Sequence, residues 1–181
     1  MTKPKILVHV CCAICAVALI EKLKETFEPV LFYYNPNIYP EDEYEKRRQS
    51  VVKMAQIYGV EFFDGNYDPK IWQDKIKGKE NEPERGARCY DCFEMRLQET
   101  AELAKEKGIE IFTTSLFVSP FKDENQVDLA GKNIARAENI KYLAMPEILD
   151  NKSENWKKTR ELAKKYNFYF QKYCGCKFSI W

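Results

Sequence analysis

The chain has 181 residues, of which 45% are hydrophobic and 31% charged, and 29 Lys and Arg against 28 Asp and Glu leave a formal net charge of +1. This composition is typical of an ordinary soluble globular protein and excludes a disordered or membrane one. It also provides no globally basic field, so a nucleic-acid partner would have to bind a local patch.

The first predicted element is a strand over Leu7–Val10, within the apolar run that begins at Ile6. The run is short, lacks a small-residue cleavage site and leads directly into cysteines, so it predicts a strand and not a signal peptide. No stretch approaches the ~20 apolar residues that a membrane span needs. We therefore expect a cytoplasmic protein.

The first half of the chain continues as alternating helices and strands. A helix face is predicted where apolar residues recur every four positions, at Cys15, Leu19, Leu23 and Phe27. The following elements are an apolar strand, a long charged helix, a strand and a short helix, at 29–34, about 41–58, 60–63 and from 68 onward. Gly59 ends the charged helix, and its Lys46-Arg47-Arg48 run is most simply a solvated face.

The second half repeats this alternation after an exposed loop. Residues 77–88 contain Gly78, Pro83 and Gly86 and almost nothing apolar. Cys89 then opens a predicted helix that ends at Gly108. A strand, a helix, a short strand and a further helix follow at 109–118, about 126–138, near 142–143 and about 155–166.

Strands that alternate with helices in this way predict a parallel sheet covered on both faces. We expect residues 1–181 to form a single doubly wound α/β domain, a Rossmann-like or HUP-like three-layer sandwich that serves as a metal-binding catalytic domain. Ligands of such sheets bind at the carboxyl ends of the strands, where the strand order reverses. Cys11 and Cys12 follow the first strand, and Ser119 and Lys122 follow the fourth, so these residues should lie together.

Seven cysteines fall into three tight groups: Cys11, Cys12 and Cys15; Cys89 and Cys92; and Cys174 and Cys176. An odd number of cysteines in a reducing compartment argues against a disulfide framework. Helix N-termini favour thiolates, and residues three apart in a first turn share one face, so two half-sites can supply four thiolates. Four thiolates suit zinc or an iron–sulfur cluster.

Adjacent Cys11 and Cys12 chelate one ion awkwardly, which favours the wider cluster over zinc. The alternative is an α/β nucleotide-binding domain with a structural zinc site of four cysteines. Such a domain should carry a Gly-rich loop after its first strand, where this chain has Cys-Cys-Ala-Ile-Cys. The Cys-x3-Cys-x2-Cys spacing of radical enzymes that use S-adenosylmethionine is absent.

Three other features carry open alternatives. Cys174-Gly175-Cys176 is either a labile redox-active dithiol or a pair of ligands to a second metal. His9, in a buried strand, is expected to be a core histidine and not a ligand. Arg85 and Arg88 lie in the exposed loop, where they either meet phosphates or pair with neighbouring glutamates to brace the loop.

Five segments in order resemble the QueH family of epoxyqueuosine reductases and span nearly the whole chain. They are Cys11-Cys12-Ala13-x-Cys15, Asn35-Pro36-Asn37-Ile38, Pro83-Glu84-Arg85-Gly86-x-Arg88-Cys89-x-x-Cys92, Ser119-Pro120, and Tyr173-Cys174-Gly175-Cys176-x-Phe178-Ser179. One departure is Ile14, where the family pattern has proline.

The resemblance implies the last step of queuosine synthesis, the two-electron reduction of an epoxide to an alkene with loss of water. Its implied partners are tRNA carrying epoxyqueuosine at the anticodon wobble position and an unidentified electron donor. Cys11, Cys12, Cys89 and Cys92 match the ligands of a 4Fe–4S cluster, and Cys174 and Cys176 match a redox-active pair. A second mononuclear iron is also implied, with Cys15, Asp91 or Asp123 as candidate ligands alongside Cys174 and Cys176. Arg85, Arg88, Ser119 and Lys122 are the candidate substrate-binding residues.

Overall fold

A computed structural model describes residues 3–149 and 152–180, which form a five-stranded parallel sheet between two layers of helices. The strands are β1 (Lys5–His9), β2 (Glu28–Tyr33), β3 (Glu61–Asp64), β4 (Ile111–Thr114) and β5 (Lys141–Tyr142). The helices are α1 (Ala13–Leu23), α2 (Glu41–Tyr58), α3 (Pro69–Lys75), α4 (Ala87–Glu106), α5 (Glu124–Glu138) and α6 (Lys152–Lys165). The predicted doubly wound α/β fold is confirmed.

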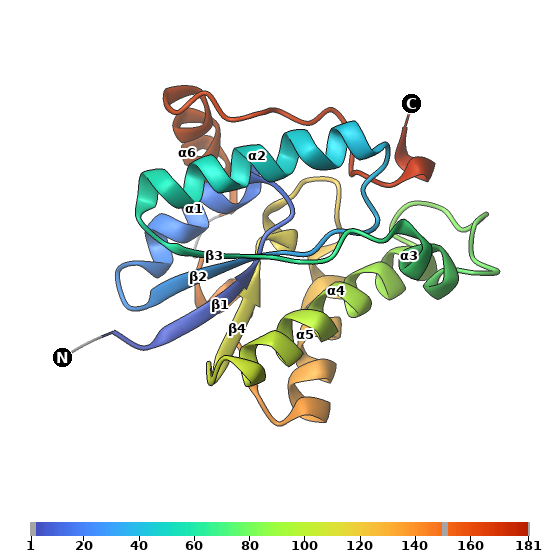
Figure 1. The fold of residues 1–181 in the computed structure, drawn as a ribbon, viewed down its shortest axis with the longest axis horizontal. Helices are drawn as coiled ribbons and strands as arrows, with labels where there is room; N and C mark the ends of the chain where they lie inside the picture. Colours follow the sequence, from blue (N-terminus) through green and yellow to red (C-terminus); the bar gives the residue numbers. More distant parts are fainter. Residues whose placement is uncertain (1–2, 150–151, 181) are drawn as a thin grey trace.

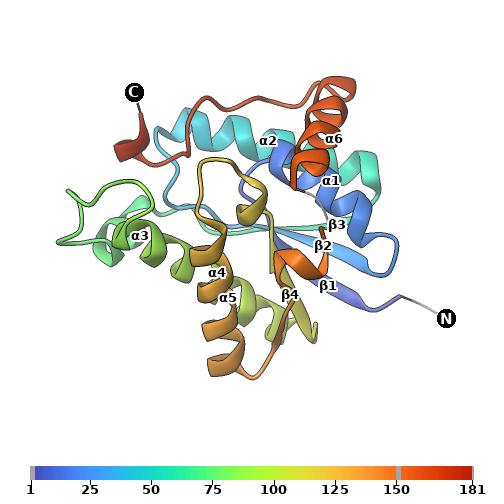
Figure 2. The same cartoon turned by 180° about the vertical axis from the view of Figure 1, so that it is seen from behind.

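Helices α1, α2 and α6 cover one face of the sheet, and α4 and α5 cover the other (Figures 1 and 2). The central strand β1 is fully buried from Ile6 to Val8, as a strand covered on both faces must be. In the part of the chain that the structure describes, no helix has the length and apolar character needed to cross a membrane.

The strand order is β3-β2-β1-β4-β5, and every neighbouring pair is parallel. The strand order therefore reverses between β1 and β4. After β1 the chain enters the helical layer on one face of the sheet, and after β4 it enters the layer on the other face. The segments that follow these two strands carry Cys11 and Cys12 on one side and Ser119 and Lys122 on the other. The reversal therefore lies where the sequence predicts it, beside these four residues.

The predicted boundary of the fourth strand is wrong. Residues 109–118 are apolar enough for one long strand, but β4 ends at Thr114, and Leu116–Val118 form a 3-10 turn. The Thr114 hydroxyl accepts a hydrogen bond from the Leu116 backbone N–H at 3.1 Å, which turns the chain away from the sheet. Hydrophobicity alone cannot reveal such a turn because the turn residues are also fully buried.

Helix boundaries follow local chemistry. In α2, Glu41, Asp42 and Glu43 occupy the first turn, where carboxylates favour the helix dipole. Gly59 closes this helix with a left-handed φ of 59°, as predicted. Helix α4 begins at Ala87, two residues before the predicted start, which places Cys89 within its first turn.

After α6 the chain forms a C-terminal tail, residues 169–180, that runs beside α2 and ends near α3 (Figures 1 and 2). Phe178 in this tail packs against the Trp72 ring of α3, with ring centroids 6.0 Å apart. The Arg88 guanidinium of α4 lies 4.6 Å from the centroid of the same Phe178 ring. The tail thus connects the α2 side of the molecule to the α3 and α4 side.

Candidate metal and redox centre

The first cysteine group lies at the carboxyl end of β1. The Sγ atoms of Cys11, Cys12 and Cys15 all lie within 4.8 Å of one another, and all three residues are buried. Cys12 caps the N-terminus of α1, and Cys15 lies one turn further along that helix. Within the described residues this is the group of three or more potential ligand side chains that is compact enough to hold one metal ion.

Hydrogen bonds within this group favour one anionic sulfur. Bonds from the Cys12 and Cys15 thiols hold the pKa of Cys11 well below its usual value, although burial opposes this. Burial raises the pKa of Cys12 to about 12, and the bond to Cys11 raises that of Cys15. Of the three sulfurs, that of Cys11 therefore ionises most readily.

The second group lies at the start of α4, with Cys89 in the first turn and Cys92 in the second, one turn later than the sequence predicts. Cys89 Sγ accepts a hydrogen bond from the Arg85 backbone N–H at 3.3 Å, and burial raises the pKa of Cys89. Burial also raises the pKa of Cys92, to about 11. The charges of Cys174 and Cys176 in the tail act on both Cys89 and Cys92, so the second and third cysteine groups lie near each other.

Lys122 connects the tail to the first group. It is only 6% exposed and, among the described residues, its ammonium makes no hydrogen bond or ion pair. Burial opposes its charge, but the nearby sulfurs of Cys174, Cys11 and Cys15 raise its pKa overall. A largely buried ammonium is costly unless anionic groups lie near it, so this position suits an anionic group.

Residues around the centre fix its walls. His9 is fully buried; its Nε2 donates to the Tyr34 carbonyl at 3.0 Å, and its Nδ1 lies 3.0 Å from Thr114 Oγ1. Burial lowers its pKa to about 3, so the ring is neutral. His9 is therefore the satisfied core histidine that the sequence predicts. Asn35 donates to the Val10 carbonyl at 2.9 Å and anchors the loop after β2 beside Cys11.

Several residues at the centre carry no clear sequence signal. Gln171 in the tail donates from Nε2 to Cys12 Sγ at 2.9 Å, and its buried Oε1 has no partner among the described residues. Ser115 lies 3.7 Å from Cys11 Sγ through its hydroxyl. The buried Trp72 indole N–H has no well-aligned acceptor in the described chain, yet it favours the Cys92 anion. A thiol-rich centre explains all three positions.

The two candidate aspartates have other partners. Asp91 Oδ2 forms an ion pair with Lys79 Nζ at 2.5 Å. Asp123 Oδ1 caps α5 by accepting from the Asn125 and Gln126 backbone N–H groups, at 2.9 and 3.3 Å. Neither aspartate belongs to a group of three or more compact ligands in the described part of the chain.

The candidate substrate-binding residues differ in exposure. Arg85 lies at the surface and donates from Nη2 to the Pro120 carbonyl at 2.9 Å. Arg88 is 3% exposed and donates to the carbonyls of Glu80 and Glu82, at 2.7 and 2.5 Å, which is the arrangement of a loop brace. Ser119 is fully buried, and its hydroxyl accepts from the Phe121 N–H at 3.3 Å.

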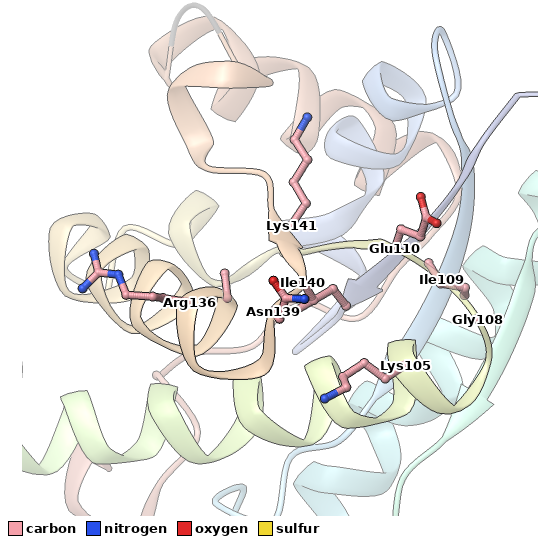
Figure 3. Close-up of a pocket in the computed structure, with 9 residues that line it drawn as sticks. Lys105, Gly108, Ile109, Glu110, Arg136, Asn139, Ile140 and Lys141 are labelled. Carbon is pink, nitrogen blue, oxygen red and sulfur yellow. The ribbon is translucent and has the colours of Figure 1, made fainter.

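A surface pocket of about 760 Å³ lies away from the cysteines (Figure 3). It is lined by residues that precede β4 and β5 and by the ends of α4 and α5: Lys105, Gly108, Ile109, Glu110, Ala135, Arg136, Asn139, Ile140 and Lys141. These residues mark the amino-terminal edge of the sheet, opposite the cysteine groups. Pocket size therefore does not locate the chemistry of this molecule.

A doubly wound α/β fold with a compact buried thiol group at its strand-order reversal defines a class of protein, the α/β proteins with a thiol group that could hold a metal ion. The family described as epoxyqueuosine reductase QueH matches residues 6–181. The chain is 36% identical to the epoxyqueuosine reductase QueH of Histophilus somni over 97% of this chain and 72% of that protein. It is 38% identical to the protein of the same name from Haemophilus influenzae, over 97% and 71%. The chain belongs to the epoxyqueuosine reductase QueH family, which confirms the resemblance and the predicted oxidoreductase function.

A solved structure supports the fold. A predicted subunit of tRNA methyltransferase from Methanocaldococcus jannaschii aligns with a TM-score of 0.54 at 17% identity, over 88% of this chain and 76% of that one. At this identity the likeness concerns the architecture alone, because one α/β architecture hosts many unrelated activities.

Proposed function

We propose that this epoxyqueuosine reductase binds a 4Fe–4S cluster through Cys11, Cys12, Cys89 and Cys92 and acts on tRNA carrying epoxyqueuosine at the wobble position. The observation that carries the proposal is that the tail bearing Cys174 and Cys176 contacts the elements of both other cysteine groups. Gln171 donates to Cys12 Sγ, and the Phe178 ring packs against Trp72 and the Arg88 guanidinium of α4. Two of the groups lie at the N-terminal ends of helices, where backbone N–H groups favour thiolates.

The residues present fit such a cluster. Sulfur ligands suit iron–sulfur centres, and a net negative cluster would accept hydrogen bonds that now have no acceptor. The unpaired Trp72 N–H and the Lys122 ammonium are suitable donors of that kind. When bound, the cluster would supply electrons one at a time from an external donor.

Reduction of the epoxide consumes two electrons and two protons and yields an alkene and water. Negative charge develops on the epoxide oxygen as its C–O bonds break, and a positioned cation stabilises that charge. In our proposal Lys122 serves this role. Cys174 and Cys176 serve either as a redox pair or, with Cys15, as thiol ligands of a second iron; we omit Asp91 and Asp123 because both carboxylates are engaged elsewhere.

We assign tRNA binding to the surface next to the cysteine groups. Arg85 is exposed next to the Cys89 helix and can reach a phosphate, whereas Arg88 is enclosed by its own loop. We therefore assign phosphate binding to Arg85 and a bracing role to Arg88. Ser119 would act by shaping the turn that presents Lys122, since its hydroxyl already bonds within that turn.

Activity on tRNA is the direct test of this proposal. Anaerobically reconstituted protein with a chemical reductant should convert epoxyqueuosine to queuosine in tRNA, measured by mass spectrometry of digested nucleosides. We expect iron and acid-labile sulfide in cluster stoichiometry. Stoichiometric zinc without sulfide in anaerobically isolated protein would contradict the cluster, and equal reduction of the free nucleoside would contradict the tRNA contact.

Replacing Lys122 with methionine tests the proposed cation. We expect Lys122→Met to lower kcat by roughly 10²-fold, the usual cost of losing one donor to a developing oxyanion, with cluster absorbance retained. Lys122→Arg should recover part of the activity, and the exposed Lys172→Met should match the unmodified protein. An unchanged kcat in Lys122→Met would remove this residue from the mechanism.

A further inference from the structure

A buried arginine of α2 holds the C-terminal tail. Arg47 is 1% exposed, so the expectation of a solvated face at this position is wrong. Its Nε donates to Glu43 Oε1 at 2.8 Å, while Nη1 donates to the Cys174 carbonyl at 2.9 Å and Nη2 to the Tyr173 carbonyl at 3.1 Å. Each nitrogen of the planar guanidinium thus has an acceptor, and two of these acceptors belong to the tail.

Other contacts hold the same stretch of tail. Glu43 uses its second oxygen to accept from the Tyr169 hydroxyl at 2.6 Å. The Tyr39 N–H donates to the Gly175 carbonyl at 2.8 Å. Gly175 has a φ of 135°, and a Cβ built there would lie 3.0 Å from Arg47 Nη1. Glycine between the two cysteines therefore lets the tail backbone approach the arginine closely.

The same guanidinium also acts on the first cysteine group. Its charge offsets only part of the burial that raises the pKa of Cys12. The tail itself contacts this group through Gln171, whose Nε2 donates to Cys12 Sγ at 2.9 Å. The buried guanidinium therefore holds the tail backbone at Tyr173 and Cys174, close in sequence to the glutamine that contacts Cys12.

We propose that Arg47, oriented by Glu43, is a positioning residue that fixes the Cys174-Gly175-Cys176 segment against the Cys11–Cys12 turn. In this proposal Arg47 contacts no substrate. Its role is to determine the position of the Cys174 and Cys176 thiols. The inference rests on the proposed role of Cys174 and Cys176, but the position of their thiols can be measured separately from activity.

A buried ion pair that serves only stability is the competing explanation. Removing one partner would leave a buried unpaired charge, which destabilises a fold for reasons unrelated to positioning. The double variant Arg47→Met/Glu43→Met avoids this because it removes both charges and keeps apolar volume. Arg47→Lys keeps the charge beside Glu43 but loses the planar contact with two carbonyls. Arg48→Met is the matched control, since Arg48 is the next residue of α2 and pairs with Asp64 and Glu45 near the surface.

The experiment measures anaerobic alkylation rates of Cys174 and Cys176 by peptide mass spectrometry in the reconstituted protein, together with kcat, KM for tRNA and cluster absorbance. In the double variant we expect alkylation to be faster by about tenfold or more. The reason is the loss of the charge-assisted hydrogen bonds that hold the tail backbone against α2. We expect kcat to fall with KM within about twofold and with cluster absorbance kept. Arg47→Lys should be intermediate, and Arg48→Met should match the unmodified protein.

Alkylation at the unmodified rate in a folded double variant would overturn the inference. If the double variant does not fold, Arg47→Lys decides the question: unmodified alkylation and kcat in that variant would overturn it. Failure of the proposed function has a different signature. If Cys174→Ser stays active while the double variant still exposes the tail thiols, Arg47 positions the tail but the tail is not needed for catalysis.

Discussion

Serine at Cys92 is expected to abolish the visible charge-transfer absorbance of the anaerobically reconstituted protein, together with all epoxide reduction. Cys92 is buried in the second turn of α4, beside the Trp72 indole N–H, and serine offers no thiolate to iron. Iron and sulfide content should fall to background. Cys89→Ser should behave in the same way, because Cys89 lies three residues before Cys92 on the same face of α4.

Cys15→Ser is the matched control for this experiment. Cys15 lies within 4.8 Å of Cys11 and Cys12 and is as buried as they are, so a general packing defect would appear in it equally. We expect Cys15→Ser to keep the cluster absorbance. If it instead loses the cluster while Cys92→Ser keeps it, the ligands come from the compact β1 group and the two-motif assignment fails.

Serine at Cys174 or at Cys176 is expected to lower epoxide reduction by more than about 10³-fold while the cluster absorbance persists. A redox pair or a second metal site cannot work with one sulfur missing, and effects of groups that act as a unit are of this order. Queuosine formation and the visible spectrum should be measured on the same preparation.

The matched control for the tail is Ser179→Ala. Ser179 is buried in the same tail and accepts through its hydroxyl from Cys176 Sγ at 3.6 Å, so it reports on packing without removing a thiol. We expect much smaller losses in this variant. Loss of the cluster in Cys176→Ser would make Cys176 a cluster ligand and would contradict the division of the cysteines proposed here.

Much of the architecture can be predicted from the sequence because its signals are local. The span of α2 follows from its charged periodic pattern and Gly59, and the position of Cys11 follows from the end of an apolar strand. The early end of β4 could not be predicted, because hydrophobicity does not change there. The chain is turned by a hydrogen bond that the Thr114 hydroxyl accepts from the Leu116 N–H. The cysteine groups were found from spacing alone.

The surroundings of those cysteines depend on tertiary contacts that no spacing encodes. Arg47 and Arg48 are adjacent and identical in type, yet one is buried against the tail and the other pairs near the surface. Gln171 bonds a cysteine 159 positions earlier in the chain. Arg88 is buried although its loop is mostly polar, because its guanidinium donates to two carbonyls and lies over the Phe178 ring. Such partners are defined only after the tail has folded back.

The separation in sequence of the cysteines after β1 and those of α4 has a consequence for the unfolded chain. Any centre held jointly by Cys12 and Cys89 is a cross-link that closes a loop of about 80 residues. By the loop-closure relation used for disulfides, a permanent cross-link of that span restricts the denatured ensemble by on the order of 4 kcal/mol. A metal centre releases its ligands on unfolding, so the benefit is instead expressed as the binding free energy itself. Resistance of this enzyme to heat and denaturant should therefore rise and fall with its metal content.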